Sequence, residues 1–354
     1  MRVLAITNLY PSDSSPGSGV FIEQQIQALR SQGTEVDVMF VDRRREGPWI
    51  YYRMGPHLQE TLVKFRPDLV HVMYGGVMAD QVTAKRGLPP AIVTLHGSDL
   101  LGENLSGLAR KIVSRYGVHC SRKAACRARG VIVVARHLID ALGRRVDTRK
   151  IRVIPCGIDL ERFKPLDRHS CQEQLGWRAD HFHVLFANSS GDPVKQPELA
   201  QAAVDQLRQR RGEVRFHLLS GIPNKEVPVW LNAGDALLLT SKQEGSPTVV
   251  KEALACGLPV ISVPVGDVAE QIAEINGCHL AEPRPADLAQ KLEFVFQERR
   301  RVDCREKLQA ISDQAIGTRI EKFYAEVLNN YAASEAKPAR AEVWTKKVGM
   351  VSSS

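Results

Sequence analysis

The chain has 354 residues, of which 44% are hydrophobic and 25% are charged. This composition is typical of a globular protein, and the length suggests two domains, each with its own core. No run approaches the ~18–20 apolar residues of a membrane span, and the start, Met1–Thr7, reads as a strand and not as a signal peptide. The seven cysteines form no Cys-x-x-Cys pair, which favours reduced thiols in a cytosol and no metal site.

Charge is divided unevenly along the chain. Residues 1–165 carry 25 basic and 15 acidic side chains, a net charge of +10, whereas the remainder has −2. The densest stretch, Arg110–Arg129, holds seven basic residues and no acidic one. Such a stretch is either a solvated helix face or a surface for anionic partners. We assign Arg115, Arg122 and Lys123 to an acceptor or membrane patch. No nucleic acid partner is expected, because aromatic platforms do not alternate with these charges.

The first half alternates between strands and helices. Arg2–Thr7 reads as a buried parallel strand, and a loop rich in Pro, Ser and Gly leads through Gly19 into a helix at Val20–Gln32. This order places backbone amides near a phosphate, although an ordinary strand–helix loop has the same order. Further strands are expected at Glu35–Val41, Leu69–Met73, Ala91–Leu95 and Val131–Ala135, and helices at Pro56–Phe65, Val77–Lys85 and Gly107–Arg127. The alternation indicates a doubly wound parallel sheet.

Two features of this half bear on function. His96 and Gly97 directly follow the strand Ala91–Leu95, and ligands of such sheets bind beyond the carboxyl ends of the strands. His96 is therefore a candidate site residue, the alternative being a loop histidine held by Asp99. In the helix Gly107–Arg127, apolar side chains recur every four residues, which predicts a buried stripe with the basic residues outside it: Leu108, Ile112, Tyr116 and Cys120.

The alternation restarts after a Pro- and Gly-containing join at Ile151–Pro165. Strands are expected at His183–Ala187, Val214–Leu219, Asp235–Thr240, Pro259–Val263 and Cys278–Leu280, and helices at Pro197–Gln209, Thr248–Cys256, Val268–Ile275 and Ala286–Glu298. Lys195 stands at a loop–helix junction after the first of these strands. A lysine there can neutralise a phosphate, or it is an exposed first-turn lysine.

The stretch Glu244–Gly257 reads as a loop that enters a helix. Gly245 allows a tight turn, Ser246 can cap the helix, and Pro247 suits its first position. The free N–H groups and the positive dipole end of a helix start favour an anion. Glu244 and Glu252 flank this start. A carboxylate beside an anion site is better suited to accept hydrogen bonds from sugar or ribose hydroxyls than to meet a phosphate.

The chain ends in an amphipathic helix at Thr318–Tyr331 and a polar, Ala- and Lys-containing segment. We expect a first Rossmann-like domain at 1–160, a second at 161–315, a helix returning to the first domain at 316–333 and a disordered tail at 334–354.

Four stretches, taken in order, resemble the retaining GT-B glycosyltransferases of family 4 over about residues 1–333. Lys150–Pro165 is similar to the linker signature of that family, and Asp192–Lys195 to its phosphate-lysine region. Glu244–Val260 matches its donor motif, with Glu-Gly-x-Pro and a second Glu, and Ala281–Pro283 resembles the end of its donor domain. The resemblance implies an α/β fold, GT-B, in which two doubly wound Rossmann-like domains face each other across a cleft and the last helix crosses back to the first domain.

The same resemblance assigns roles within the site. Glu244 would contact the hydroxyls of the donor sugar, Glu252 the nucleotide ribose, and His96 the region of the attacking hydroxyl. Lys195 would stabilise the leaving diphosphate. The remaining donor-binding residues would be Gly19, Gly245, Ser246, Pro247 and Thr248. Many relatives carry an Arg six residues before the Lys, where this chain has Ser189, and Asn188 is a neutral substitute donor.

The implied activity is a retaining transfer of a hexosyl or N-acetylhexosaminyl group from a nucleotide-diphosphate sugar, a UDP- or GDP-sugar, to a hydroxyl acceptor. No Asp-x-Asp motif is present, so we expect a metal-independent enzyme without a cofactor. The acceptor would belong to glycan, lipopolysaccharide or glycolipid biosynthesis and would be lipid-linked or anionic. The enzyme would be cytoplasmic and peripheral at the inner membrane face. Two alternatives remain, a catalytically weak sugar-nucleotide-binding partner subunit and a sugar-nucleotide epimerase of the same fold.

Overall fold

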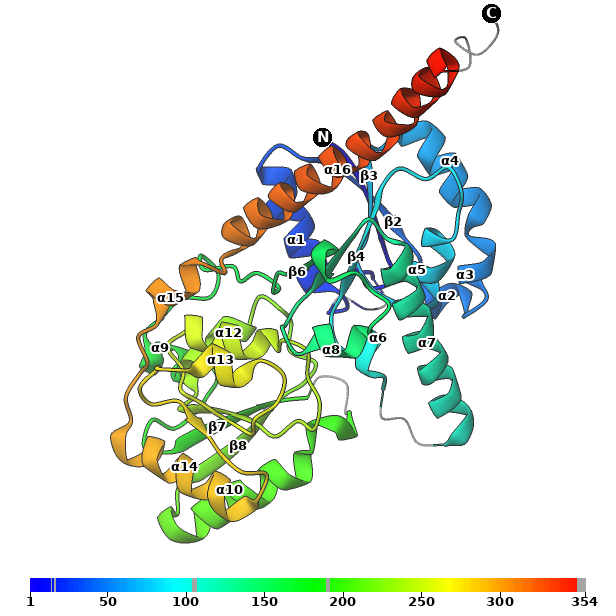
Figure 1. Ribbon diagram of the computed structural model, residues 1–354. Helices are drawn as coiled ribbons and strands as arrows, with labels where there is room; N and C mark the ends of the chain where they lie inside the picture. The colour runs from blue at the N-terminus through cyan, green and yellow to red at the C-terminus, as the bar shows by residue number, and fades with distance from the viewer. Residues whose placement is uncertain (14, 16, 104–106, 189–191, 349–354) are drawn as a thin grey trace, which may run out of the picture.

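The computed structural model describes residues 1–13, 15, 17–103, 107–188 and 192–348, with 336–348 described by their backbone only. Two α/β domains follow each other along the chain, and a long C-terminal helix runs from the second domain across the first (Figure 1). All strand pairs between the named strands of the described residues are parallel, as expected from the strand–helix alternation.

The first sheet has the order β2-β1-β3-β4-β5-β6 in the described part of the chain. Its strands are buried apolar runs, as a sheet covered on both faces requires: β1 Arg2–Thr7, β2 Glu35–Phe40, β3 Leu69–Val72, β4 Ala91–Leu95, β5 Gly130–Val133 and β6 Ile151–Val153. The helices around it are α1 Val20–Ser31, α2 Arg43–Glu46, α3 Ile50–Arg53, α4 Gly55–Phe65, α5 Gly76–Thr83, α6 Ser98–Leu101, α7 Leu108–Arg127 and α8 Leu138–Leu142.

The second sheet has the order β11-β10-β9-β7-β8. Its strands are β7 Phe182–Ala187, β8 Val214–Leu219, β9 Ala236–Leu239, β10 Val260–Ser262 and β11 His279–Leu280. The helices are α9 Arg168–Gln174, α10 Pro197–Arg211, α11 Val227–Ala233, α12 Thr248–Ala255, α13 Val268–Ile272, α14 Pro285–Glu298 and α15 Arg305–Gln309, and one-turn 3₁₀ helices lie at Thr148–Lys150 and Pro193–Lys195. Each sheet has its own buried apolar core.

Helix α16, Asp313–Val348, returns to the first domain as expected (Figure 1). Ile320, Phe323 and Tyr324 are buried against the first sheet. Tyr324 Oη lies 2.6 Å from Nδ1 of His71, whose Nε2 lies 2.6 Å from Oγ1 of Thr94. A side chain on Gly130 would collide with Phe323, so this glycine on β5 admits the helix.

The chain crosses between the domains twice, and the two crossings are joined. Ile158 in the linker donates its N–H to the carbonyl of Ile311 at 3.1 Å and accepts from the N–H of Asp313 at 3.1 Å. A Cβ on Gly157 would lie 2.3 Å from a carboxylate oxygen of Asp313, so the close approach requires glycine here. The two crossings are therefore held together by backbone hydrogen bonds.

Two expectations differ from the structure. The stripe on α7 is not buried as a whole: Cys120 is buried, whereas Leu108, Ile112 and Tyr116 are exposed, because the first turns of the helix project beyond the sheet that covers the rest (Figure 1). Residues 334–348 continue α16 as helix where a disordered tail was expected. Residues 349–354 lie outside the described residues.

Candidate active site

The expected site residues follow the carboxyl ends of four strands. Gly19 lies in the loop after β1, His96 follows β4, Lys195 follows β7, and Glu244 follows β9. Parallel sheets place all these ends at one edge, and the edges of the two sheets meet. The loops of His96-Gly97 and of Glu244-Gly245 are in direct contact across the domains.

Glycine is required on both sides of that contact. A Cβ on Gly245 would lie 1.9 Å from the carbonyl oxygen of His96, and a Cβ on Gly97 would lie 3.0 Å from Cα of Gly245. Gly97 also has φ of 135°, which side chains rarely adopt. The histidine loop of the first domain and the Glu244-Gly245 loop of the second domain thus meet at one place.

Lys195 and Glu244 form an ion pair inside this site. Nζ of Lys195 lies 2.5 Å from Oε1 of Glu244, and the Glu244 side chain is only 12% exposed. Such a pair holds a cation and a hydroxyl-accepting carboxylate side by side in the absence of ligand. The lysine can turn to an incoming anion while the carboxylate accepts hydrogen bonds from hydroxyls.

The loop that carries Lys195 is fixed by its neighbours. Buried Thr240, just after β9, donates its hydroxyl to the carbonyl of Lys195 at 2.7 Å. Asp192 caps the 3₁₀ turn by accepting from the N–H of Val194 at 2.9 Å. Asn188 is buried and accepts from the N–H of Asp192 at 2.8 Å, so its amide holds this loop. Ser189, where many relatives have Arg, lies outside the described residues.

Helix α12 begins at Thr248 with Pro247 as N-cap and without a side-chain cap. The expected capping by Ser246 is therefore wrong. Its Oγ lies 3.4 Å from the side-chain Nε2 of Gln271 instead. No described side chain caps the first turn, so its N–H groups and the positive end of the helix dipole stay available to an anion.

Glu252 lies one turn into α12 and is partly buried. Burial raises the pKa of its carboxyl to about 7, although the positive charges of Arg162 and Lys251 oppose the shift. No hydrogen bond joins this carboxyl to another described side chain. A partly buried carboxylate without such partners is suited to accept hydrogen bonds from the hydroxyls of a ligand.

The ring of His96 is fully engaged within the protein. Nε2 lies 3.0 Å from the carbonyl oxygen of Met73 and must donate to it, and Nδ1 lies 3.7 Å from Sγ of Cys156. Burial alone would lower the pKa of His96, but Cys156 and the charge of Asp99 outweigh it and raise the pKa above its ordinary value. Neither ring nitrogen is free to take a proton from an acceptor in this arrangement, so the carbonyl of His96 is the group that faces Gly245.

Asp99 holds the His96 loop through its backbone and not through the ring. Its carboxylate accepts from the N–H groups of Gly75, His96 and Gly97 at distances of 2.9–3.0 Å. Three amide donors on one carboxylate fix the turn after β4 against the turn after β3. The alternative interpretation of His96 was a loop histidine held by Asp99. Asp99 does hold this loop, through the backbone N–H groups of His96 and Gly97.

Gly19 begins α1 with φ of 70°, and no side chain caps this helix. A Cβ on Gly19 would lie 2.3 Å from the backbone carbon of Leu9, so the tight loop requires glycine. Phe21, in the first turn, packs on the His96 ring with 4.9 Å between the ring centroids. The N-terminus of α1 therefore lies beside the histidine loop.

Two residues of the site were missed from sequence. Lys251 is almost fully buried, and its Nζ donates to the carbonyl of Cys156 at 3.0 Å, which ties α12 to the linker. Burial alone would raise the pKa of the Cys156 thiol, but His96 and Lys251 outweigh it and hold the pKa below its ordinary value. The available signal was the position of Cys156 within Lys150–Pro165, the stretch that resembles the linker signature.

The acceptor or membrane patch is only partly free. Lys123 pairs with buried Asp80 at 3.3 Å, and Nε of Arg122 donates to the carbonyl of Ala141 at 2.8 Å. The side chain of Arg115 is exposed and has no hydrogen bond or ion pair within the described part of the chain. Among the described helices none is long and apolar enough to cross a bilayer. Nor do His, Cys, Asp and Glu side chains gather into a metal-binding cluster among the residues described.

Two facing Rossmann-like domains, with an uncapped helix start and a Lys–Glu pair at their junction, define a glycosyltransferase of the GT-B class. Residues 16–162 match the family model Glycosyltransferase Family 4, and residues 181–316 match Glycosyl transferases group 1. The chain therefore belongs to the family 4 glycosyltransferases.

Relatives and solved structures agree with this assignment. The chain is 27% identical to TuaC of Bacillus subtilis, named for teichuronic acid biosynthesis, over 76% of this chain and 82% of TuaC. It is also 27% identical to the D-inositol 3-phosphate glycosyltransferase of Paenarthrobacter aurescens, over 46% of this chain and 47% of that protein. Sucrose-phosphate synthase of Thermosynechococcus elongatus superposes with a TM-score of 0.77, at 18% identity over 93% of this chain and all of that one. HepE of Anabaena, solved in complex with UDP and glucose, superposes with a TM-score of 0.65, at 18% identity over 92% of this chain and 99% of that one.

Proposed function

We propose that this protein is a retaining glycosyltransferase that moves a hexosyl or N-acetylhexosaminyl group from a nucleotide-diphosphate sugar to a hydroxyl acceptor. The observation that carries the proposal is the Lys195–Glu244 ion pair beside the uncapped start of α12, in contact with the His96 loop of the other domain. One cation, one carboxylate and free amides stand where a diphosphate and a sugar would meet.

The costly charge in this reaction forms on the leaving diphosphate as the bond from the sugar carbon to the phosphate oxygen breaks. Lys195, the amides at the start of α12 and those at Gly19 are preorganised donors that can stabilise it without a metal ion. No cofactor is needed in this proposal. Lys195 would exchange its contact with Glu244 for the phosphate, which frees the carboxylate for the sugar hydroxyls.

In this proposal the configuration at the anomeric carbon is retained, because the acceptor attacks the same face from which the leaving group departs. The acceptor oxygen bonds to the anomeric carbon, and its proton passes to the phosphate oxygen that leaves. His96 is not required as a base, in keeping with its two engaged ring nitrogens. In this proposal it shapes the junction through its carbonyl and its packing.

For the donor we propose a UDP-sugar before a GDP-sugar, because HepE, a structural neighbour of similar fold, is described in complex with UDP. The acceptor side is proposed from TuaC, whose name places it in the biosynthesis of a polysaccharide. We infer a role in the assembly of a glycan or glycolipid at the cytoplasmic side of a membrane, with the basic first domain facing an anionic partner.

The test is a thermal-shift and turnover screen of the purified protein against sugar nucleotides. We expect stabilisation by one nucleotide, slow release of nucleoside diphosphate that a chelator does not abolish, and retained anomeric configuration in the product. Lys195→Ala and Glu244→Gln should each lower turnover by on the order of 100-fold, the scale of losing one preorganised group. Rates like those of the wild type in both variants would refute the assignment.

The same assay separates the alternatives. An epimerase would change the configuration of the sugar without any acceptor. A partner subunit that only binds would show the thermal shift with no turnover.

A further inference from the structure

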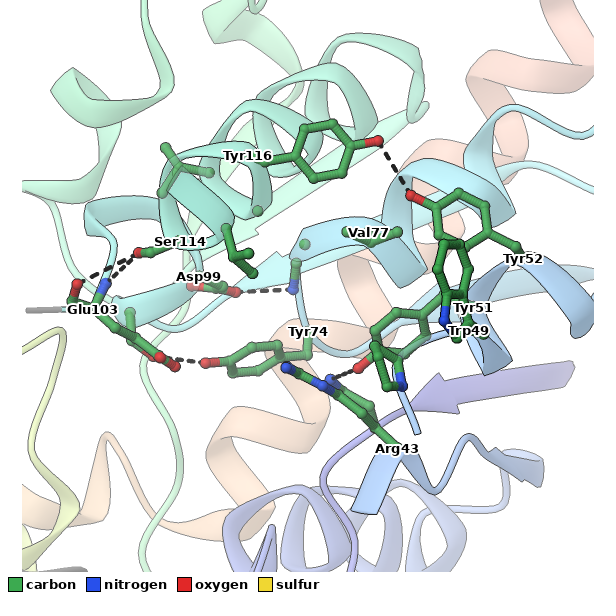
Figure 2. Close-up of a pocket in the computed structure, with 18 residues that line it drawn as sticks. Arg43, Trp49, Tyr51, Tyr52, Tyr74, Val77, Asp99, Glu103, Ser114 and Tyr116 are labelled. Atoms are coloured by element: carbon green, nitrogen blue, oxygen red, sulfur yellow. Dashed lines mark hydrogen bonds between the residues drawn. The ribbon is translucent and has the colours of Figure 1, made fainter. Parts of the chain in front are cut away.

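A pocket of about 360 Å³ lies in the first domain beside the His96 loop. Trp49, Tyr51 and Tyr52 stand on one side of it and Tyr116 reaches in from α7, while Tyr74 lies below (Figure 2). Most of the exposed wall is apolar, and the charged side chains that also line the pocket are Arg43, Asp99 and Glu103. Such a lining favours an apolar or amphiphilic ligand over a fully polar one.

The pocket is adjacent to the reaction centre. Tyr74 lines it and also stacks on the His96 ring, with 5.8 Å between the centroids and 12° between the planes. Asn8, directly after β1, lines it too and donates to the hydroxyl of Tyr51 at 2.7 Å. The Tyr74 ring therefore contacts both the pocket and the His96 ring at the junction of the two domains.

The outer rim of the pocket continues onto an exposed apolar surface. Val113 and Tyr116 line the pocket and are exposed, and the same face of α7 carries Leu108, 77% exposed, and Ile112. Trp49, 67% exposed, and Tyr52 extend this surface from α3 and the turn before it. We call these six residues the apolar edge; no described residue covers it. Large apolar side chains this exposed and contiguous mark a binding surface.

Charge around the apolar edge points to its occupant. Arg110, Lys111 and Arg115 flank it on α7, and their side chains make no hydrogen bond or ion pair with a described residue. Arg43 lies at the pocket. No acidic residue occurs between 108 and 129. An apolar stripe with Trp and Tyr, bordered by unpaired cations, is the pattern of a helix that lies in the interface of an anionic bilayer.

We propose that the apolar edge docks on an anionic lipid surface and that the pocket behind it admits the apolar part of a lipid-linked acceptor from that surface toward His96. Arg43 would face the anionic group next to the lipid chain. The identity of the acceptor rests on the proposed function, whereas docking does not, so the two can fail separately.

Docking is tested by co-sedimentation of the full chain with phosphatidylcholine vesicles, with and without phosphatidylglycerol, in the absence of donor. We expect binding only to the anionic vesicles. Replacing two exposed aliphatic residues in Leu108→Asn/Ile112→Asn should weaken it roughly 10-fold or more. Val63→Asn is the matched control, because Val63 is equally exposed on α4.

The charge contribution has its own pair of variants. Neutralising Arg110, Lys111 and Arg115 together to Gln should weaken binding to anionic vesicles by on the order of 100-fold. The control neutralises Lys64, in the last turn of α4, and Arg66 and Arg86, which follow α4 and α5. Absence of binding by the wild type, equal binding to neutral vesicles, or equal loss in both triple variants would overturn the proposal.

The pocket is tested with Gly117→Leu. Gly117 is a helical position that lines the pocket, and a Cβ there would meet no atom within 4 Å, so the side chain fills the pocket without disturbing the fold. A short alkyl phosphate is the probe. We expect it to bind the wild type and Ala109→Leu, an exposed α7 control, but to bind Gly117→Leu at least ~10-fold more weakly. Equal binding by all three, or binding of a short oligosaccharide in its place, would refute the lipid assignment of the pocket.

Discussion

Glu252 allows a direct test of the proposed donor site, because its partly buried carboxylate lowers the stability of the folded protein without nucleotide. Burial raises its pKa from 4.5 to about 7, so the folded protein holds the proton more tightly than the unfolded chain. The penalty is absent below pH 4.5, grows as the pH rises and is complete above pH 7. A shift of this size corresponds to at most about 3 kcal/mol, and to about half of that once partial exposure of the side chain is allowed for.

Glu252→Gln removes the charge and keeps the shape. We expect the variant to unfold at a temperature roughly 5 °C above the wild type at pH 8, and at the same temperature near pH 4.5. Its affinity for a nucleotide should fall at pH 8, because an amide is a weaker acceptor for ribose hydroxyls than a carboxylate. In the wild type, nucleotide affinity should decline as the pH falls through 7.

The assay is thermal unfolding at both pH values, with and without the nucleotide found in the screen. Glu270→Gln, an exposed carboxylate on α13, is the control and should change neither stability nor affinity. A stability difference between Glu252→Gln and the wild type that stays constant with pH would refute the burial argument. Unchanged nucleotide affinity at pH 8 would refute the ribose role.

Three further outcomes are expected. Gly245→Ala should abolish detectable transfer while the unfolding temperature changes little, since its Cβ would collide with the carbonyl of His96 at the junction only; near-normal transfer would contradict the contact. In Lys195→Met the partner Glu244 stays unpaired, so adding Glu244→Gln should recover stability but not turnover, measured by thermal unfolding and diphosphate release; recovered turnover would refute the Lys195 role. Tyr324→Phe leaves Nδ1 of buried His71 without its partner and should cost about 1–3 kcal/mol in denaturant unfolding; an unchanged midpoint would argue against docking of α16 through this bond.

Much of the fold was readable in the sequence because it depends on local pattern. Apolar β-branched runs alternate with helical segments, so strands such as β1 and β4 could be placed within a residue or two. The motif from Glu244 to Glu252 predicted a helix start at Thr248, since the residues of a helix start stand together in the chain.

Contacts between distant segments are not contained in such patterns. The Lys195–Glu244 pair and the engagement of His96 by Met73 and Cys156 depend on how loops from separate strands meet. The capping expected of Ser246 was wrong for this reason: its hydroxyl lies near the Gln271 side chain, 25 residues further along.

Helix α7 shows which features follow from the sequence pattern and which depend on the tertiary structure. Its period of four placed Leu108, Ile112 and Tyr116 correctly on one face, because helix geometry alone fixes which side chains are aligned. Whether another element covers that face depends on the length of the sheet beneath it, and here the helix outruns the sheet (Figure 1). The sequence by itself determined the amphipathic face, and the tertiary structure decided that three of its four residues meet solvent beside the aromatic pocket.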